Sequence, residues 1–172
     1  MKIVLLGYMA SGKTSIGKKL AKILNVPFVD LDDLISEKEK LSIQDLFKIK
    51  GEIYFRKKEI ESLNEILLQK ENFILAVGGG TPCYGSNMSV INNNSTSIYL
   101  KSSLQSIYNK LSDKKNKHIR PLISEINNKE LKDFIAKHLF ERSPFYEQAH
   151  YTVETDNKSK KEIAQEISSN MQ

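Results

Sequence analysis

The sequence feature that most constrains this chain is a short glycine-containing loop close to its start. Residues 7–14 read Gly-Tyr-Met-Ala-Ser-Gly-Lys-Thr, which matches the G-x-x-x-x-G-K-[ST] pattern of a phosphate-binding loop. The apolar run 3–6 precedes the loop, and apolar residues follow it at helical spacing: Ile16, Leu20, Ile23 and Leu24. The pattern therefore predicts a buried strand, a P-loop and a helix, in the order that such a loop requires.

The residue types in this loop suit the phosphates of a nucleotide. Glycines let backbone N–H groups turn inward around phosphate oxygens, and the positive end of the following helix adds to that anion site. Lys13 supplies a charge for the β- and γ-phosphates, and the Thr14 hydroxyl can hold Mg²⁺. The competing interpretation, a glycine turn with a chance lysine, requires four motif positions and both flanking elements to coincide. The predicted nucleotide-binding residues of the loop are Ala10, Ser11, Gly12, Lys13, Thr14 and Ser15.

Length and composition predict one globular domain, residues 1–172, with 40% hydrophobic and 27% charged residues. No run approaches the roughly 20 apolar residues that cross a bilayer, and the chain enters a strand at once without a basic leader. We therefore expect a soluble cytoplasmic protein without a membrane partner. The single cysteine, Cys83, forms no internal disulfide and shares no metal-ligand spacing with the histidines. The net charge is +5, but the lysines are scattered, so we expect no nucleic-acid partner.

Arginine is scarce in this lysine-rich chain. Of the 26 Lys and Arg residues only three are arginine: Arg56, Arg120 and Arg142. The planar guanidinium binds a carboxylate or a phosphate through two parallel hydrogen bonds, which lysine cannot imitate. The alternative is that each arginine lies on a solvated face. Arg56 in particular has Glu52 and Glu59 at helical spacing, which is also the pattern of a surface salt bridge.

Acidic residues follow the second predicted strand. Residues 27–29 read as a strand that ends in Asp30-Leu31-Asp32-Asp33. In an open α/β sheet, ligands bind beyond the carboxyl ends of the strands, so these carboxylates would face the phosphates. One can hold Mg²⁺, usually through water, while another orients and deprotonates a hydroxyl nucleophile. The alternative is an acidic first turn of a helix beginning near Leu34, which is the role expected of Asp33.

Three successive glycines follow the third predicted strand, residues 73–77. Gly78, Gly79 and Gly80 lose much conformational entropy on folding, and they are best explained where the backbone comes unusually close to another group. A flexible turn is the alternative. The position at the carboxyl end of a strand favours the wall of a ligand site.

The remaining pattern alternates helices and strands. We expect helices over 34–50, with a break near 40–42, and over 52–68, then a strand at 97–100 and a helix marked by Leu104, Ile107 and Leu111. A helix over 127–150, a strand at 151–154 and a closing helix around 163–171 follow. The charged stretch 113–121 is a solvated loop by default, or a lid that brings Arg120 to the transferring phosphate. The alternation predicts a single α/β domain with a mainly parallel sheet.

Taken together, these motifs strongly resemble shikimate kinase, from residue 3 to about residue 155. The P-loop alone indicates only nucleotide binding, whereas the Asp-x-Asp, triple-glycine and arginine motifs in this order are much more specific. The matching motifs are Gly7-x-Met9-x-x-Gly12-Lys13-Thr14, Asp30-x-Asp32, Phe55-Arg56-x-x-Glu59, Gly78-Gly79-Gly80, Arg120-Pro121-Leu122 and Arg142-x-x-x-Tyr146.

The resemblance implies an α/β, three-layer P-loop kinase fold like that of the nucleoside monophosphate kinases. It implies a five-stranded parallel sheet of order 2-3-1-4-5 flanked by helices, a shikimate-binding region at about 31–61 and a lid at about 112–124. It also implies a monomer. Ala10 stands where many relatives have glycine, and we expect alanine to be accommodated there. The arginines that relatives often place around adenine are replaced by Ser112-Asp113-Lys114 and Asp156-Asn157-Lys158.

The activity that the resemblance implies is transfer of the ATP γ-phosphoryl group to the 3-hydroxyl of shikimate, a step towards chorismate and the aromatic amino acids. ATP is then the co-substrate and Mg²⁺ the cofactor, held by Thr14 and Asp30. Lys13, Asp32 and Arg120 take the catalytic roles, with Lys13 and Arg120 on the phosphates. The implied shikimate-binding residues are Asp32, Arg56, Gly78, Gly79, Gly80 and Arg142.

Three other functions compete with this hypothesis. A kinase for another small molecule, such as gluconate, would share the loop and lid but has no need of two arginines beside a triple glycine. A GTPase is disfavoured because Asn109-Lys110-Leu111-Ser112-Asp113 is one residue too long for the guanine-reading Asn-Lys-x-Asp motif. A non-catalytic ATP-binding module of the same fold is distinguished only by activity.

Overall fold

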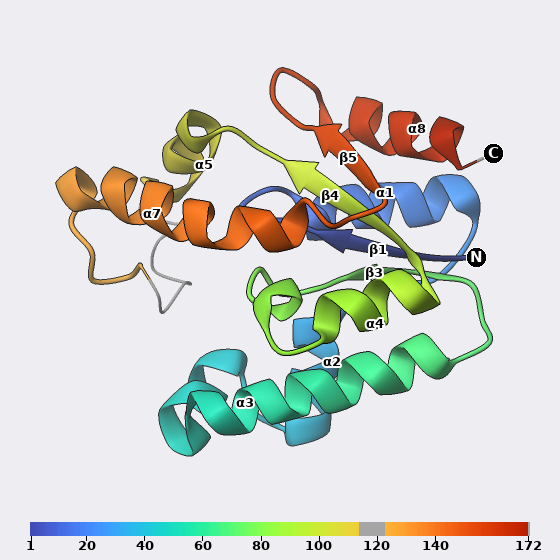
Figure 1. The fold of residues 1–172 in the computed structure, drawn as a ribbon, viewed down its shortest axis with the longest axis horizontal. Helices are drawn as coiled ribbons and strands as arrows, with labels where there is room; N and C mark the ends of the chain where they lie inside the picture. Colours follow the sequence, from blue (N-terminus) through green and yellow to red (C-terminus); the bar gives the residue numbers. More distant parts are fainter. Residues whose placement is uncertain (114–122, 172) are drawn as a thin grey trace.

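The computed structural model describes residues 1–113 and 123–171, which build on a five-stranded parallel sheet (Figure 1). The strand order is β2-β3-β1-β4-β5, which confirms the predicted order. The P-loop strand β1 therefore lies at the centre of the sheet, between β3 and β4. The strands are β1 (Lys2–Leu6), β2 (Phe28–Asp30), β3 (Phe73–Ala76), β4 (Thr96–Lys101) and β5 (Tyr151–Glu154).

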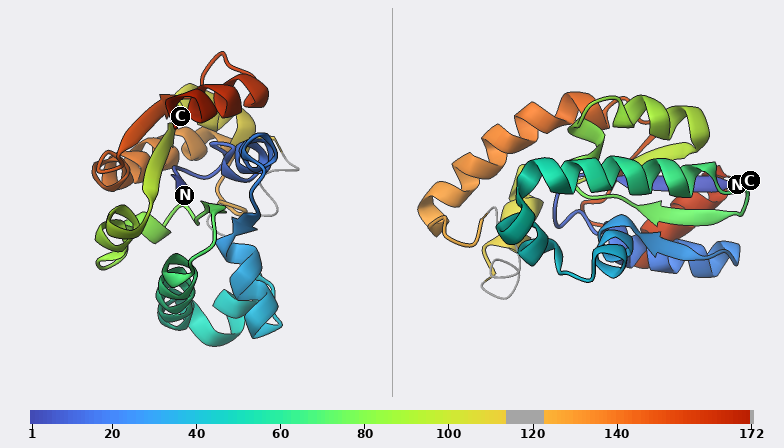
Figure 2. Two further views of the ribbon diagram at one scale, coloured as in Figure 1. Left: turned by 90° about the vertical axis from the view of Figure 1, so that its right-hand side faces the viewer. Right: turned by 90° about the horizontal axis from the view of Figure 1, so that it is seen from below.

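Side chains of β1 alternate between two apolar clusters, one on each face of the sheet. Ile3 and Leu5 belong to a cluster with α1 (Lys13–Leu24) and α8 (Lys160–Asn170). Val4 and Leu6 belong to the larger cluster on the opposite face, which includes α3 (Ile43–Leu68), α4 (Asn87–Asn94), α5 (Leu104–Leu111) and α7 (Asn128–Tyr146). A strand covered on both faces reads as a continuous apolar run. Figure 2 shows the resulting three layers, as predicted.

The shikimate-binding region predicted at 31–61 consists of two helices. Helix α2 (Leu31–Glu39) begins three residues earlier than expected, because the Asp30 carboxylate caps it by accepting a hydrogen bond from Asp32 N at 3.2 Å. Helix α3 runs through Gly51, whose φ of 82° kinks it at the predicted boundary between two helices. Asp33 lies in the first turn of α2, as expected.

Two short helical elements were not predicted. A turn of 3₁₀ helix, η1 (Thr81–Cys83), follows the triple glycine, and α4 follows it in an asparagine-rich segment of low helix propensity. Met88 and Ile91 lie three residues apart on α4 and are both buried in the core. Packing of these two side chains, rather than local propensity, stabilises α4.

Helix α7 starts where it was predicted and ends early. Asn127 caps it by accepting hydrogen bonds from two backbone N–H groups, and the helix ends at Tyr146, two residues after Pro144. The expected continuation to residue 150 was therefore wrong, although Pro144 itself lies inside the helix, where its missing N–H removes one bond of the helical ladder. Across residues 1–113 and 123–171, no helix is both long and apolar enough to span a bilayer.

Candidate active site

The P-loop joins β1 to α1 with the backbone geometry that its glycines allow. Gly7 and Gly12 have φ of 145° and 99°, a region that side chains with a Cβ atom rarely adopt. A Cβ atom at Gly7 would also lie 2.7 Å from the Leu100 carbonyl oxygen, so no other residue fits there. The Ser11 hydroxyl is buried inside the loop and makes no hydrogen bond to the part of the chain that the structure describes.

Lys13 lies folded back across this loop. Its Nζ donates hydrogen bonds to the carbonyl oxygens of Gly7 at 2.8 Å and Tyr8 at 2.9 Å. The ammonium group is therefore held at the mouth of the loop by main-chain acceptors. Phosphate oxygens entering the loop would meet this charge directly.

Ala10 has a left-handed backbone, with φ of 62°. The alanine is accommodated, as expected from the sequence, but in a conformation that glycine adopts with less strain. The left-handed region costs a residue with a Cβ atom roughly 1–2 kcal/mol, and this strain is located in the loop itself.

Ala10→Gly has two opposing effects on stability: it relieves the backbone strain of the folded state, and it raises the conformational entropy of the unfolded chain. Because the first effect is larger, we expect the free energy of unfolding to rise by about 0.5–1 kcal/mol. Urea denaturation of both proteins measures this difference. Gly85→Ala provides the matched control, because its φ of 52° is also left-handed and no atom lies within 4 Å of the added Cβ. Gly85→Ala should lower the free energy of unfolding. If Ala10→Gly and Gly85→Ala changed the free energy of unfolding equally and in the same direction, the explanation by backbone strain would be contradicted.

Thr14 and Asp30 meet beside the loop. Thr14 Oγ1 donates a hydrogen bond to Asp30 Oδ2 at 2.8 Å, while Asp30 Oδ1 accepts from Asp32 N. Asp30 thus caps α2, as one interpretation of the sequence expected, and also contacts Thr14 in the P-loop helix. A hydroxyl and a carboxylate are the hard oxygen donors that Mg²⁺ prefers. Within the described residues, no group of three or more acidic, His or Cys side chains could hold a metal ion.

Asp32 has the properties of a proton acceptor tuned towards neutral pH. Its Oδ1 is buried and accepts no hydrogen bond from the described residues. Burial raises the pKa of Asp32 to about 6, the nearby charges of Asp30 and Glu59 add to the rise, and Lys13 opposes it. A carboxyl group with a raised pKa in a site of this kind is a candidate general base.

The three glycines form a wall against which three predicted site residues converge. A Cβ atom at Gly80 would lie 2.7 Å from Arg56 Nη2, one at Gly79 would lie 3.2 Å from Arg142 Nη1, and one at Gly78 would lie 3.3 Å from Asp32 Oδ1. Each glycine thus makes room for a different side chain. The structure thus brings Asp32, Arg56 and Arg142 together from α2, α3 and α7.

Arg56 makes both ion pairs that its helical spacing allowed, but its own side chain is only 12% exposed, so it does not lie on a solvated face. Its Nη1 donates to Glu59 Oε2 at 2.8 Å, and the side chain of Glu59 is only 1% exposed. Glu59 also accepts a hydrogen bond from Thr81 Oγ1 at 2.6 Å, while Arg56 Nε lies 3.5 Å from Glu52 Oε1. The buried Glu59 therefore orients Arg56. Sequence reasoning missed the part played by Thr81, because nothing in the sequence shows that η1 folds back onto α3.

Arg142 is held close to the glycine wall by its own helix. Tyr146, one turn further along α7, is fully buried and donates a hydrogen bond to the Gly79 carbonyl oxygen at 2.6 Å. This contact joins α7 to the same glycine that faces the Arg142 guanidinium. The Arg142-x-x-x-Tyr146 motif thus has a simple geometric basis, since residues four apart lie on one helix face.

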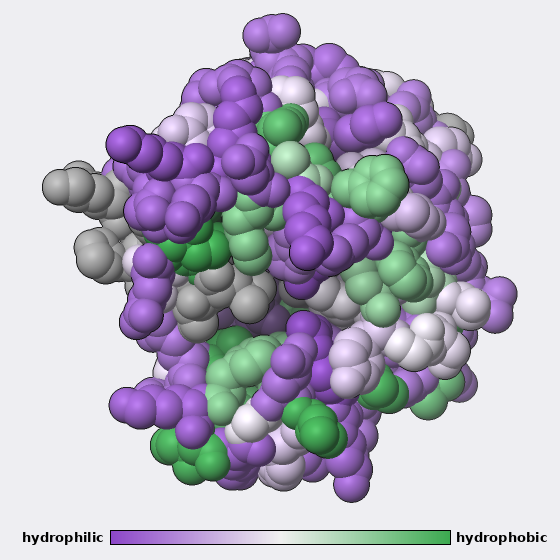
Figure 3. All heavy atoms as spheres, turned by 60° about the vertical axis from the view of Figure 1, so that its left-hand side comes forward, coloured by the Kyte–Doolittle hydropathy of each residue, from purple (hydrophilic) through white to green (hydrophobic). Residues whose placement is uncertain are grey.

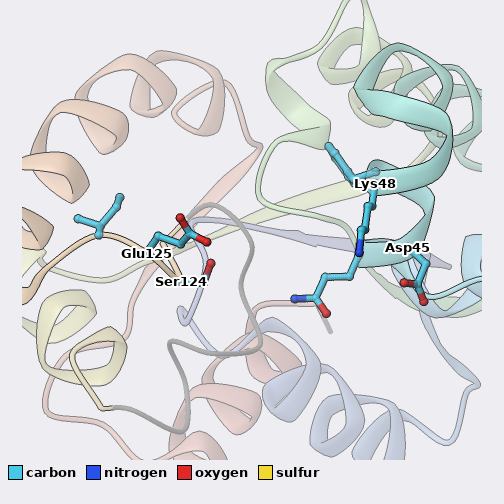
Figure 4. A pocket seen from close by; sticks show the side chains of 7 residues that line it. Asp45, Lys48, Ser124 and Glu125 are labelled. Carbon is cyan, nitrogen blue, oxygen red and sulfur yellow. The ribbon is translucent and has the colours of Figure 1, made fainter.

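A pocket of about 650 Å³ opens on the side of the molecule that carries the start of α3. Asp45 and Lys48 of α3 lie on one side of it, and Ser124 and Glu125 lie on the other (Figure 4). Figure 3 shows this side of the molecule, where the surface is hollowed between its upper and lower parts. The pocket is therefore bounded by the predicted shikimate-binding region and by the described end of the predicted lid.

Arg120 and most of the predicted lid lie outside the described residues. The segments expected near adenine are described in part: Asp156 accepts hydrogen bonds from Ser103 N at 3.3 Å, which places the β5–α8 turn against the start of α5. Lysines flank the P-loop on this side. Lys110 Nζ donates to the Ala10 carbonyl oxygen at 3.3 Å, and Lys160 Nζ lies 3.3 Å from Ser15 Oγ.

Comparison with known proteins identifies the family. The family model for shikimate kinase matches residues 9–172. The shikimate kinase of Flavobacterium johnsoniae is 47% identical over 167 residues, which cover 96% of each chain. Among solved structures, shikimate kinase from Bacteroides thetaiotaomicron superposes with a TM-score of 0.90 at 33% identity, covering 99% of this chain and 98% of that one.

A second solved structure, shikimate kinase from Acinetobacter baumannii in complex with shikimate, superposes with a TM-score of 0.87 at 33% identity. The superposition covers 99% of this chain and 92% of the Acinetobacter baumannii chain. These likenesses span nearly the whole sequence and agree with the strand order and the converging motifs described above. The chain belongs to the shikimate kinase family.

Proposed function

We propose that this chain transfers the γ-phosphoryl group of ATP to the 3-hydroxyl of shikimate, giving shikimate 3-phosphate and ADP. One observation carries the proposal beyond family membership: the triple-glycine wall brings a buried carboxylate, Asp32, together with two guanidinium groups, Arg56 and Arg142. Shikimate has a hydroxyl group that Asp32 could contact and a carboxylate that Arg56 and Arg142 could bind. We further infer a monomer, as the family resemblance implies, and a cytoplasmic location, as expected from the sequence.

The nucleotide side of the site neutralises phosphate charge. The P-loop N–H groups and Lys13 would hold the β- and γ-phosphates, and Arg120 would stabilise the charge of the group being transferred. Thr14 and Asp30 are the residues that would hold Mg²⁺, since a hydroxyl and a carboxylate are oxygen donors of the kind it prefers. When bound, Mg²⁺ supplies positive charge that offsets the repulsion between the phosphates and the incoming hydroxyl.

The acceptor side of the site holds and activates shikimate. Arg56 and Arg142 would bind its carboxylate through paired hydrogen bonds, which fixes the distance from the ring to the phosphates. Asp32 would orient the 3-hydroxyl and accept its proton as the oxygen attacks the γ-phosphorus. The P–O bond to ADP then breaks, and the proton leaves from Asp32 to water.

Gluconate kinase-like activity and a non-catalytic module remain the alternatives. Gluconate also has a carboxylate, but an open-chain acceptor does not need two arginines fixed against a rigid wall. A non-catalytic module has no use for a buried carboxylate with a raised pKa, because burial of such a group destabilises the fold.

Arg56→Lys and Arg142→Lys are expected to raise the KM for shikimate about 10-fold or more each, because a hydrogen bond to a charged group contributes roughly 1.5–3 kcal/mol and lysine loses the paired geometry. The KM for ATP should change little, since both arginines are proposed to bind the carboxylate of shikimate and not the phosphates of the nucleotide. Steady-state kinetics with each substrate varied in turn measures both constants.

Lys57→Arg is the matched control for this test, because Lys57 is exposed on α3 beside Arg56 and its replacement keeps the charge. It should leave both KM values unchanged. For an acceptor that lacks the carboxylate, the wild-type enzyme and the lysine variants should have the same high KM. Lysine variants that bind shikimate as tightly as the wild type would remove the clamp from the proposal.

A further inference from the structure

Four side chains of α7 lie in a row that faces the P-loop and the glycine wall. Phe134, His138, Arg142 and Tyr146 follow one another at intervals of four residues, so they share one face of the helix. Tyr146 fixes one end of this row through its hydrogen bond to Gly79. His138, two turns before Tyr146, contacts Tyr8 in the P-loop.

Tyr8 contacts both His138 and Arg142. Its hydroxyl lies 2.9 Å from His138 Nδ1, and the two rings meet edge to face with centroids 5.5 Å apart. The guanidinium carbon of Arg142 lies 5.9 Å from the centroid of the Tyr8 ring, within the range of a cation–π contact. Tyr8 is 1% exposed, so its ring is a fixed surface under the arginine.

The environment keeps both members of this pair uncharged. Burial raises the pKa of Tyr8 to about 12. Burial, and then the positive charge of Arg142, lower the pKa of His138 to about 4, while Glu141 opposes this change. A neutral imidazole shares one proton with the phenol and places no second cation one turn from Arg142.

Tyr8 also contacts the phosphate side of the site through its backbone. Its carbonyl oxygen accepts a hydrogen bond from Lys13 Nζ at 2.9 Å. One residue therefore touches the lysine proposed for the phosphates and the arginine proposed for the shikimate carboxylate. Simple core packing would explain a buried aromatic ring here, but it does not require the hydroxyl to meet a polar atom of the helix that carries Arg142.

We propose that Tyr8 and His138 are positioning residues that fix Arg142 for the shikimate carboxylate. This inference rests on the proposed function. The phenol ring supports the guanidinium from below, and the Tyr8–His138 hydrogen bond sets the distance between α7 and the P-loop. Neither residue touches a reacting atom, so their effect is on the binding of shikimate and not on the proton transfer.

The test uses two variants that remove the hydrogen bond. Tyr8→Phe removes only the hydroxyl group, whereas His138→Leu roughly keeps the volume of the side chain and also removes its ring contacts with Tyr8 and Phe134. Each is expected to raise the KM for shikimate about 5-fold, as suits one buried hydrogen bond, with kcat and the KM for ATP changed by less than about 2-fold. His138→Asn, which places a polar atom near the position of Nδ1, should restore most of the loss. Phe140→Leu, at an exposed position of the same helix, is the control for changes in helix stability.

A double-mutant cycle separates positioning from packing. If Tyr8 acts through Arg142, then Tyr8→Phe should have no further effect on the KM for shikimate once Arg142→Met has removed the guanidinium. A purely structural role would lower the melting temperature of Tyr8→Phe, shift both KM values together and add to the effect of Arg142→Met. Either that pattern or an unchanged KM for shikimate in Tyr8→Phe and His138→Leu overturns the inference. A wild-type protein that does not phosphorylate shikimate would instead overturn the proposed function.

Discussion

Replacing Asp32 by Asn is expected to lower kcat by at least about 100-fold, the lower range for the loss of a positioned general base. The amide keeps the shape of the carboxylate but accepts no proton. The wild-type enzyme should also lose kcat/KM as the pH falls below about 6, because its proton acceptor becomes protonated there. In Asp32→Asn this limb of the pH profile should disappear.

The same replacement is expected to stabilise the fold at neutral pH. The pKa of Asp32 is raised in the folded protein from 3.8 to about 6, so the buried charge destabilises the fold fully above pH 6 and not at all below the unfolded pKa. Removing it should add up to about 3 kcal/mol to the free energy of unfolding at pH 7, since one pKa unit is 1.36 kcal/mol. The gain should fade as the pH falls from about 6 to about 4, which thermal melts across this range measure.

Asp30→Asn is the comparison for Asp32, because Asp30 lies two residues away and contacts Thr14 instead of the glycine wall. It should raise the Mg²⁺ concentration needed for half-maximal activity and leave the pH profile in place. Identical Mg²⁺ titrations and pH profiles for the two variants would show that the two carboxylates do not divide the work in this way.

Lys13→Ala is the second change with a large expected effect, a loss of at least about 100-fold in kcat, as found when one stabilising donor is removed from a transition state. The fold should remain, because the Lys13 ammonium donates to carbonyl oxygens of the loop and the side chain belongs to neither apolar cluster of the core. Single-turnover rates at saturating ATP measure the loss, and a thermal melt checks the fold.

Lys19→Ala is the control for this change. Lys19 is an exposed lysine of the same helix, so its removal alters charge and helix propensity without touching the loop. It should retain wild-type activity. Turnover by Lys13→Ala at the rate of Lys19→Ala would remove the P-loop lysine from the mechanism.

Much of this fold follows from the sequence because its central strands, β3, β1 and β4, are covered on both faces. The run Ile3-Val4-Leu5-Leu6 supplies both apolar clusters, so a strand could be predicted without any alternation of polar residues. The strand order was predicted from the resemblance to shikimate kinase, which rests on the sequence motifs. Helix α4 could not be predicted, because its asparagines disfavour a helix and only the burial of Met88 and Ile91 compensates.

The site was predictable in its residue types and less so in its geometry. The triple glycine indicated a close approach, and the structure shows a different neighbour at each of the three positions, which no local pattern specifies. The spacing of Arg56 and Glu59 fits a surface pair as well as a buried one, and only the position of α3 against η1 decides between them. Tyr8 and His138 are 130 residues apart, so their contact depends on the placement of α7 beside the central strand.

The central claim, phosphoryl transfer from ATP to shikimate, is tested most directly by identifying the products. The wild-type chain is incubated with Mg²⁺ and ATP or GTP, together with shikimate, gluconate or no acceptor. ADP is then measured, and the phosphorylated product is identified by ³¹P NMR. The account predicts shikimate 3-phosphate and ADP in equal amounts with shikimate and ATP, and only background hydrolysis with gluconate or without an acceptor. ADP release that does not depend on shikimate, or faster phosphorylation of gluconate than of shikimate, would contradict it.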